Sequence, residues 1–132
     1  MDMYKVIGQH KPDYLLADPQ GAELIAIPLE PGNGTVKRGT IVYRKASGLF
    51  APAAEAEAVT TNFLAVVDET VDTTLNATVA EDARAYRAGR LAKNKVTLAA
   101  DAAVTPAVEL VLRKQGIMLD VTTEAPEFNN KI

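Results

Sequence analysis

Apolar residues occur in short blocks separated by turn-forming residues, and these blocks predict a series of short strands. Residues 23–29 are aliphatic, with Pro28 restricting them to an edge strand or a strand end. Residues 36–43 and 49–52 flank a polar turn and predict a β-hairpin. Residues 63–67 form a continuous apolar run, typical of a strand buried on both faces. The pattern therefore favours a β-rich fold.

Residues 78–92 carry two conflicting patterns. Thr78 opens a Thr-x-x-Glu capping box and Gly89 suits the residue after a helix, which together favour a helix over residues 79–88. The sequence YRAGR at residues 86–90 fits instead a strand, a tight turn and a second strand. The pattern leaves both structures open.

One helix is predicted clearly, over residues 106–115. Thr105 can cap it, and Pro106 suits the first position, where the backbone needs no N–H partner. Gly116 fits the left-handed residue that follows a helix. Residues 117–121 then predict a final short strand.

Together these elements predict an α+β, β-rich fold: a small, compact β-barrel-like or β-hairpin domain with one short C-terminal helix. We expect the domain to span residues 22–121. Residues 1–21 contain prolines and a glycine as breakers and no sustained period, so we expect an extended N-terminal arm. Residues 122–132 form a polar C-terminal tail that we expect to be frayed.

Length and charge narrow the function classes. A chain of 132 residues favours one domain. Its formal net charge of −3 argues against nucleic-acid binding, which needs a basic surface. No apolar run reaches about 18 residues, so no membrane partner is expected. The absence of cysteine removes disulfides, thiolate catalysis and zinc–thiolate sites. Aromatic residues make up only 5% of the chain, which suggests that association completes the core.

Few residues are candidates for chemistry. His10 is the only histidine and lies in the expected arm, without partners for a triad or a metal site. Asp68, Glu69 and Asp72 cluster in a polar loop over residues 68–74, where carboxylates can perform acid–base chemistry or bind calcium. A solvated loop is the favoured alternative. We therefore predict no catalytic residue, no metal site and no cofactor, and a protein that is not an enzyme.

The chain has one basic cluster, which lies close to the ambiguous segment. We expect a solvated face, with an interface to an acidic partner as the alternative. Its members are Arg84, Arg87, Arg90, Lys93 and Lys95.

Three blocks in a fixed order resemble the head decoration proteins of lambda-type tailed phages. They are RGTIV at residues 38–42, GLFAP at 48–52 and FLAVVD at 63–68. A Tyr-x-x-Gly turn pattern at residues 86–89 and a small helix leading into an apolar strand over residues 112–119 extend the resemblance. It covers the whole predicted domain.

The resemblance implies a non-enzymatic virion structural protein that binds the outside of the phage head as a homotrimer and stabilises the capsid. Its partner would be the major capsid protein of a tailed phage, and its location the capsid surface of the virion, after synthesis in the bacterial cytoplasm. In that family the N-terminal arm adds a strand to the shell protein. The arm sequence here differs from that of the best-known members, but Tyr4, Lys5, Val6 and Ile7 can add a strand to a partner's sheet edge, so we expect these residues to bind the capsid.

The chain departs from the best-known members because it is rich in alanine, lacks tryptophan and continues into a polar tail. Three alternatives therefore stay open. The first is another phage structural component, such as a tail-tube or head-fibre base protein. The others are a small hydrolase that uses Asp68 or Asp72, and a sugar-binding β-module.

Overall fold

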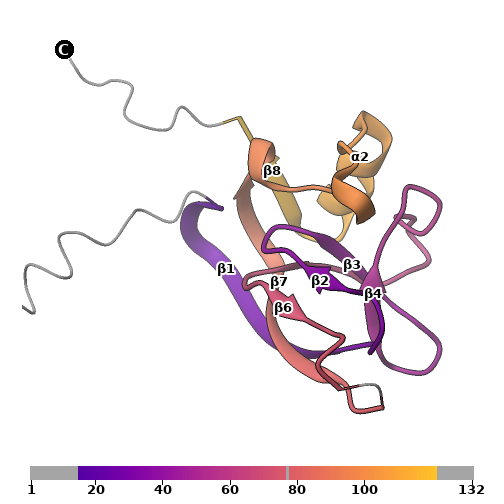
Figure 1. Cartoon of the computed structure of the whole chain (residues 1–132). Coiled ribbons are helices and arrows are strands. Elements are labelled where there is room, and N and C mark those ends of the chain that lie inside the picture. Colours follow the sequence, from indigo (N-terminus) through magenta and orange to yellow (C-terminus); the bar gives the residue numbers. More distant parts are fainter. Residues whose placement is uncertain (1–14, 77, 122–132) are drawn as a thin grey trace, which may run out of the picture.

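The computed structural model describes residues 15–76 and 78–121 (Figure 1). These residues form eight strands, one α-helix and two short 3₁₀ helices, so the predicted β-rich α+β class is confirmed. The strands are β1 (Leu16–Leu29), β2 (Thr35–Val36), β3 (Ile41–Arg44), β4 (Phe50–Pro52), β5 (Leu64–Val67), β6 (Val71–Asp72), β7 (Glu81–Ala92) and β8 (Ile117–Asp120). The helices are η1 (Lys93–Lys95), η2 (Ala99–Asp101) and α2 (Pro106–Lys114).

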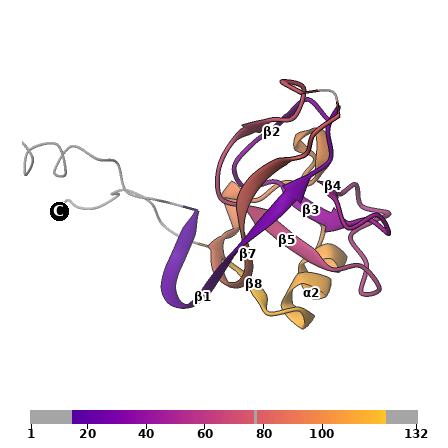
Figure 2. The same cartoon turned by 90° about the horizontal axis from the view of Figure 1, so that it is seen from below.

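Five strands close into a small barrel, as the two views in Figures 1 and 2 show. β1 pairs with β4, β4 with β3, β3 with β5, β5 with β7, and β7 again with β1. The pairing of β1 with β4 is the shortest in the ring. It consists of the parallel pair Leu29 and Phe50, next to which the Glu30 N–H donates to the Phe50 carbonyl at 2.8 Å. β8 joins β7 in parallel, outside the ring.

The sheet separates two apolar cores, because side chains alternate between its faces. On β5, Leu64 and Val66 contribute to one core, while Ala65 and Val67 contribute to the other. The first, the helix-side core, includes Leu112 of α2 and residues of β8. The second, the barrel core, takes side chains from all five barrel strands. All four residues of β5 are buried, which confirms the predicted strand with two covered faces.

The C-terminal helix and the strand after it are confirmed. The Thr105 hydroxyl accepts a hydrogen bond from the Val108 N–H at 3.2 Å, and Pro106 occupies the first turn. Gly116 follows the helix with φ of 99°, a conformation that favours glycine. The chain can therefore reverse directly into β8 and pack α2 on the helix-side core.

One side chain fastens the end of α2 to the start of β5. The Gln115 amide nitrogen donates to the Asn62 carbonyl at 2.8 Å, and its amide oxygen accepts from the Leu64 N–H at 3.0 Å. The primary amide thus pairs with the chain as a neighbouring strand would. This contact helps to fix how the helix sits on the sheet.

The β3–β4 hairpin is confirmed, but the predicted strand over residues 36–43 is interrupted. Val36 belongs to β2, which pairs with Val71 of β6, and β3 begins only at Ile41. Gly39 lies between them with φ of 94°. The polar loop expected over residues 68–74 therefore contains a short strand, β6.

β7 corrects both structures expected for residues 78–92. The helix over residues 79–88 and the turn at residues 86–89 are wrong, because residues 81–92 form one strand. Gly89 has a different role from a turn or a cap. A Cβ on Gly89 would lie 3.0 Å from the Ala22 Cα, so glycine here allows β1 and β7 to approach closely. Pairing on both sides of β7 overrides the local helix signal.

The boundary expected at residue 21 between arm and domain is also wrong. β1 begins at Leu16, and Leu15 is only 3% exposed within the helix-side core. The Leu15 carbonyl accepts a hydrogen bond from the Ala92 N–H at 2.7 Å. The breakers near residue 20 mark an irregular ladder, in which β1 carries extra residues between Asp18 and Glu23.

Candidate functional site

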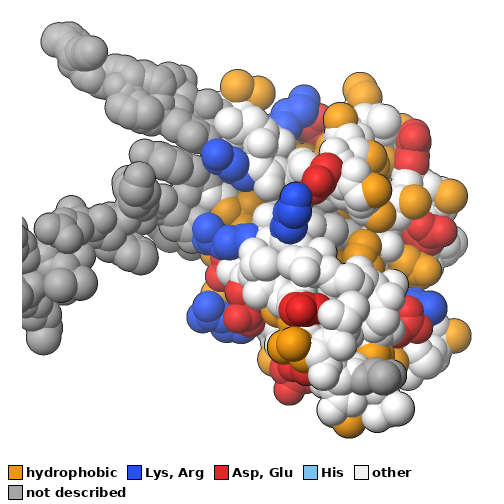
Figure 3. Space-filling view, in the orientation of Figure 1, with side chains coloured by type: hydrophobic (Ala, Val, Ile, Leu, Met, Phe, Trp, Pro, Cys, Tyr) orange, Lys and Arg blue, Asp and Glu red, His pale blue; other side chains and the backbone are white. Residues whose placement is uncertain are grey.

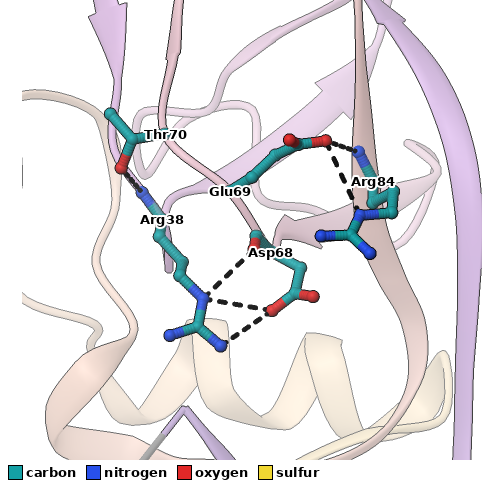
Figure 4. Close-up of polar contacts among 5 residues, drawn as sticks. All are labelled: Arg38, Asp68, Glu69, Thr70 and Arg84. Carbon is teal, nitrogen blue, oxygen red and sulfur yellow. Dashed lines mark hydrogen bonds and ion pairs between the residues drawn. The ribbon is translucent and has the colours of Figure 1, made fainter. Parts of the chain in front are cut away.

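The loop after β5 carries the carboxylates that the sequence marks as candidates for catalysis, and each is engaged. Asp68 Oδ1 accepts from Arg38 Nε at 3.1 Å and from Arg38 Nη2 at 3.0 Å (Figure 4). The Asp68 side chain is only 10% exposed. Two hydrogen bonds from one guanidinium hold a carboxylate in a fixed orientation. Asp68 therefore joins β5 to the connection between β2 and β3.

Glu69 points to a different arginine, as Figure 4 shows. Its Oε2 accepts from the backbone N–H of Arg84 at 2.7 Å and lies 3.8 Å from Arg84 Nε. The hydroxyl of Thr70 accepts from the Arg38 N–H at 3.1 Å. Consecutive loop residues thus bind two separate parts of the barrel rim, and the carboxylates of Asp68 and Glu69 do not form a pair.

The Asp72 side chain stabilises the turn that includes Thr74. Its Oδ1 accepts from the hydroxyl and from the backbone N–H of Thr74, and these bonds hold the pKa of the Asp72 carboxyl below its ordinary value. A general acid needs the opposite change, because its carboxyl must stay protonated near neutral pH. Among the described residues no group of three acidic, histidine or cysteine side chains is placed to hold a metal ion. The loop geometry therefore gives no support to hydrolase chemistry.

Four members of the basic cluster form a row of ion pairs with acids from neighbouring elements. The pairs are Arg84 with Glu69 (3.8 Å), Arg87 with Glu23 (2.7 Å), Arg90 with Asp120 (3.8 Å) and Lys93 with Glu109 (3.0 Å). Basic and acidic side chains accordingly lie next to one another on the surface in Figure 3. The sequence marked the bases but not their partners, which come from β1, the loop after β5, α2 and β8.

A bulge explains how Arg84, Arg87 and Arg90 all become exposed on one strand at a spacing of three. Glu23 pairs with Ala88 and Leu24 pairs with Tyr86, so Arg87 has no residue opposite to it. The extra residue resets the alternation of side chains along β7. A spacing of three exposed residues is also found on helices, so it does not by itself identify β7 as a strand.

The ion pair of Arg87 and Glu23 shows that this row of ion pairs is exposed to solvent. The hydrogen bond from Arg87 lowers the pKa of the Glu23 carboxyl, and the same bond raises the pKa of Arg87. Both side chains are about half exposed, at 48% and 52%, so water and salt screen their attraction. The row therefore helps to set the register of β1 on β7 more than it stabilises the fold.

The predicted capsid-binding residues Tyr4, Lys5, Val6 and Ile7 lie outside the described residues, as does His10. The structure does show where the segments that contain them join the fold. Leu16 of β1 and Leu119 of β8 both pair with Leu91 of β7, from opposite sides. Residues 1–14 and 122–132 therefore join the fold at the same end of β7 (Figures 1 and 2).

No family model matches this chain, and a search of curated proteins finds no match. In the described residues, no helix has the length and apolar character needed to cross a membrane.

Proposed function

We propose that this chain is a non-enzymatic structural protein of a tailed-phage virion, which binds the outside of the head as a homotrimer and stabilises the capsid. The observation that carries the proposal is the join between the N-terminal segment and the barrel. Residues 1–14 precede Leu15, whose side chain is buried in the helix-side core. Because the segment is attached to the core at Leu15, a partner that binds residues 1–14 is held firmly to the barrel.

The order of the elements also supports the proposal. The β3–β4 hairpin, the buried strand β5, the helix α2 and the strand β8 follow one another in the order on which the family resemblance rests. One part of the resemblance loses its support, because residues 86–89 lie inside β7 and do not form a turn. The resemblance therefore rests on the blocks before residue 69 and after residue 105.

The segment has the length to engage a partner away from the barrel. Ile7 precedes Leu15 by eight positions, and an extended chain of that length spans roughly 26–29 Å. Alternating side chains at Tyr4, Val6 and their neighbours suit a strand that adds to the open sheet edge of another protein. Three such segments in one trimer would bind cooperatively, because the second and third act at a high local concentration.

Association of subunits would cover side chains that the described residues leave exposed. Leu75 is 77% exposed and Val79 is 56% exposed, both on the connection between β6 and β7, and Leu110 on α2 is 50% exposed. The β6–β7 connection and α2 are different surfaces, and a head-to-tail contact in a ring joins two different surfaces of neighbouring subunits. A closed trimer would limit the assembly to three copies.

Co-sedimentation with expanded and unexpanded phage heads tests the proposal. The full chain is compared with a chain that begins at Leu15, and with the variants Val6→Pro and Val6→Thr. We expect the full chain and Val6→Thr to bind expanded heads, because threonine keeps the backbone N–H and the preference for a strand. Val6→Pro and the truncated chain should not bind, because proline lacks the N–H. Saturating binding by the truncated chain would refute the role of the segment.

A further inference from the structure

The connection between β6 and β7 presents apolar side chains on an acidic stretch of the chain. Leu75 and Val79 are among the most exposed large apolar side chains of the described residues. Asn76 Oδ1 accepts from the Thr78 and Val79 N–H groups at 3.0 and 3.1 Å, so the chain turns between Leu75 and Val79. We call these two side chains, together with the adjacent carboxylates, the loop surface: Leu75, Val79, Glu81 and Asp82.

The loop surface carries negative charge that its own subunit does not neutralise. Residues 68–82 contain five acidic residues and no basic one. Three of these acids bind partners within the same subunit. Glu81 and Asp82 form no ion pair with any residue in 15–76 or 78–121, and the Asp82 side chain is exposed. A basic partner surface would therefore complement this part of the molecule.

The outer face of α2 has the opposite charge. Leu110 is half exposed, and Arg113 and Lys114 follow it by three and four positions, so the three side chains lie on one face of the helix. Within the part of the chain that the structure describes, the exposed Arg113 and Lys114 form no ion pair. Bases near the C-terminus of a helix interact with its dipole, which accounts for their position but not for the exposed leucine beside them. We call Leu110, Arg113 and Lys114 the helix surface.

We propose that the loop surface of one subunit docks on the helix surface of a second copy of the same chain. Both surfaces combine exposed apolar side chains with unpaired charges, which are acidic on one and basic on the other. They lie at opposite ends of the barrel in Figures 1 and 2, so one subunit cannot join them to each other. Each copy therefore offers the two surfaces to different neighbours, and only the closure of these contacts into a ring of three rests on the proposed function.

Apolar burial and charge contribute differently to this contact. Burial of the exposed leucine and valine side chains supplies attraction, while the charges select the orientation and speed the encounter. Two copies that met loop to loop or helix to helix would bring like charges together, which disfavours a contact between identical surfaces. The apolar area is small and the charges are exposed, so assembly should depend on protein concentration and weaken as salt is added.

Sedimentation of surface variants of the full chain tests the proposal. Leu75→Ser changes only the loop surface and Leu110→Gln changes only the helix surface, and both replace exposed side chains, so the fold should be kept. We expect each variant to need an at least about tenfold higher protein concentration than the unaltered chain for half assembly. The control is Leu24→Ser, which changes an exposed leucine on β1 and should assemble like the unaltered chain.

A mixture of the two variants gives the sharper result. Leu75→Ser keeps an intact helix surface and Leu110→Gln keeps an intact loop surface, so one complete contact can form between them. At a concentration where each variant alone is monomeric, we expect one-to-one pairs and no larger species. A mixture that stays monomeric would overturn the proposal. Unchanged assembly of either variant, or an unaltered chain that is monomeric at every concentration, would also overturn it.

Binding to expanded heads separates this contact from the proposed function. A chain that assembles through the two surfaces but does not bind heads would support the contact and contradict the proposed function. A chain that binds heads, and whose assembly neither variant changes, would contradict the contact alone. Growth beyond three copies as the concentration rises would support the contact and contradict a closed trimer.

Discussion

Replacement of Gly39 by alanine should be among the most damaging small changes in this chain. Gly39 has φ of 94°, and a Cβ there would lie 2.1 Å from the Lys95 carbonyl oxygen. Two atoms that are not bonded to each other cannot lie this close. The carbonyl oxygen belongs to the backbone, so it cannot move aside as the end of a flexible side chain can. Gly39 is also held on both sides, since its N–H donates to the Val67 carbonyl and its carbonyl accepts from the Thr97 N–H.

The expected cost follows from two contributions. The left-handed backbone costs alanine about 1 kcal/mol relative to glycine. The connection between β7 and α2 must also move away from residues 39–41. This movement breaks the hydrogen bonds that Thr97 makes with the Gly39 carbonyl and the Ile41 N–H, at about 1 kcal/mol each. It also loosens the packing of the buried Val96 and Leu98 side chains. We therefore expect Gly39→Ala to lower the free energy of unfolding by about 3–5 kcal/mol, a large share of the roughly 5–15 kcal/mol typical of a domain.

Gly48→Ala is the matched control, because Gly48 has nearly the same φ, 92°, but no atom within 4 Å of the added Cβ. It should cost only the backbone contribution of about 1 kcal/mol. Urea unfolding followed by circular dichroism gives both free energies. Equal losses for the two variants would refute the close approach of the Lys95 backbone to Gly39.

Three further results are expected. A chain that lacks residues 1–14 should unfold at the same temperature as the full chain. A chain that lacks residues 1–18 also loses the buried Leu15 side chain, so its free energy of unfolding should fall by about 2 kcal/mol or more. Equal unfolding temperatures for the two truncated chains would contradict a domain that begins at Leu15. Gln115→Ala should cost about 1–2 kcal/mol in urea unfolding, because two backbone groups near the start of β5 lose their partner, and an unchanged midpoint would show that water replaces the amide. Folding lowers the pKa of Glu23 from its ordinary 4.5, because Arg87 donates to its carboxylate, so this stabilisation is present above pH 4.5 and is lost as the pH falls through the folded pKa. Glu23→Gln should therefore weaken the fall in stability below pH 4.5, and an identical pH profile would contradict it.

Local signals were enough where several of them agreed. The cap Thr105, Pro106 and the glycine Gly116 all lie within a few residues of α2, and β5 was evident from its unbroken apolar run. β7 was missed because its state depends on partners far along the chain. The Thr-x-x-Glu pattern at Thr78 resembles a helix start, and Gly89 resembles a cap or turn glycine although it serves a close contact with Ala22.

The candidate site was harder to predict than the fold. Asp68 looked available for chemistry because its partner, Arg38, lies thirty positions earlier in the chain. The arginines of β7 looked like a positive surface because Glu23 and Asp120 approach them only through the β1–β7 and β7–β8 ladders. Residue types and their spacing identified which groups carry charge, but only the strand pairing determines which of these charges meet.

Electron cryomicroscopy of expanded phage heads incubated with the purified full chain tests the central proposal most directly. The account predicts added density on the outside of the shell, with three copies of the barrel around each local three-fold position and each N-terminal segment continuing from Leu15 into a strand of the shell protein. Heads that survive heating or dilution better after decoration would accompany this result. Bare heads at saturating protein concentration, or single barrels scattered without three-fold order, would contradict it.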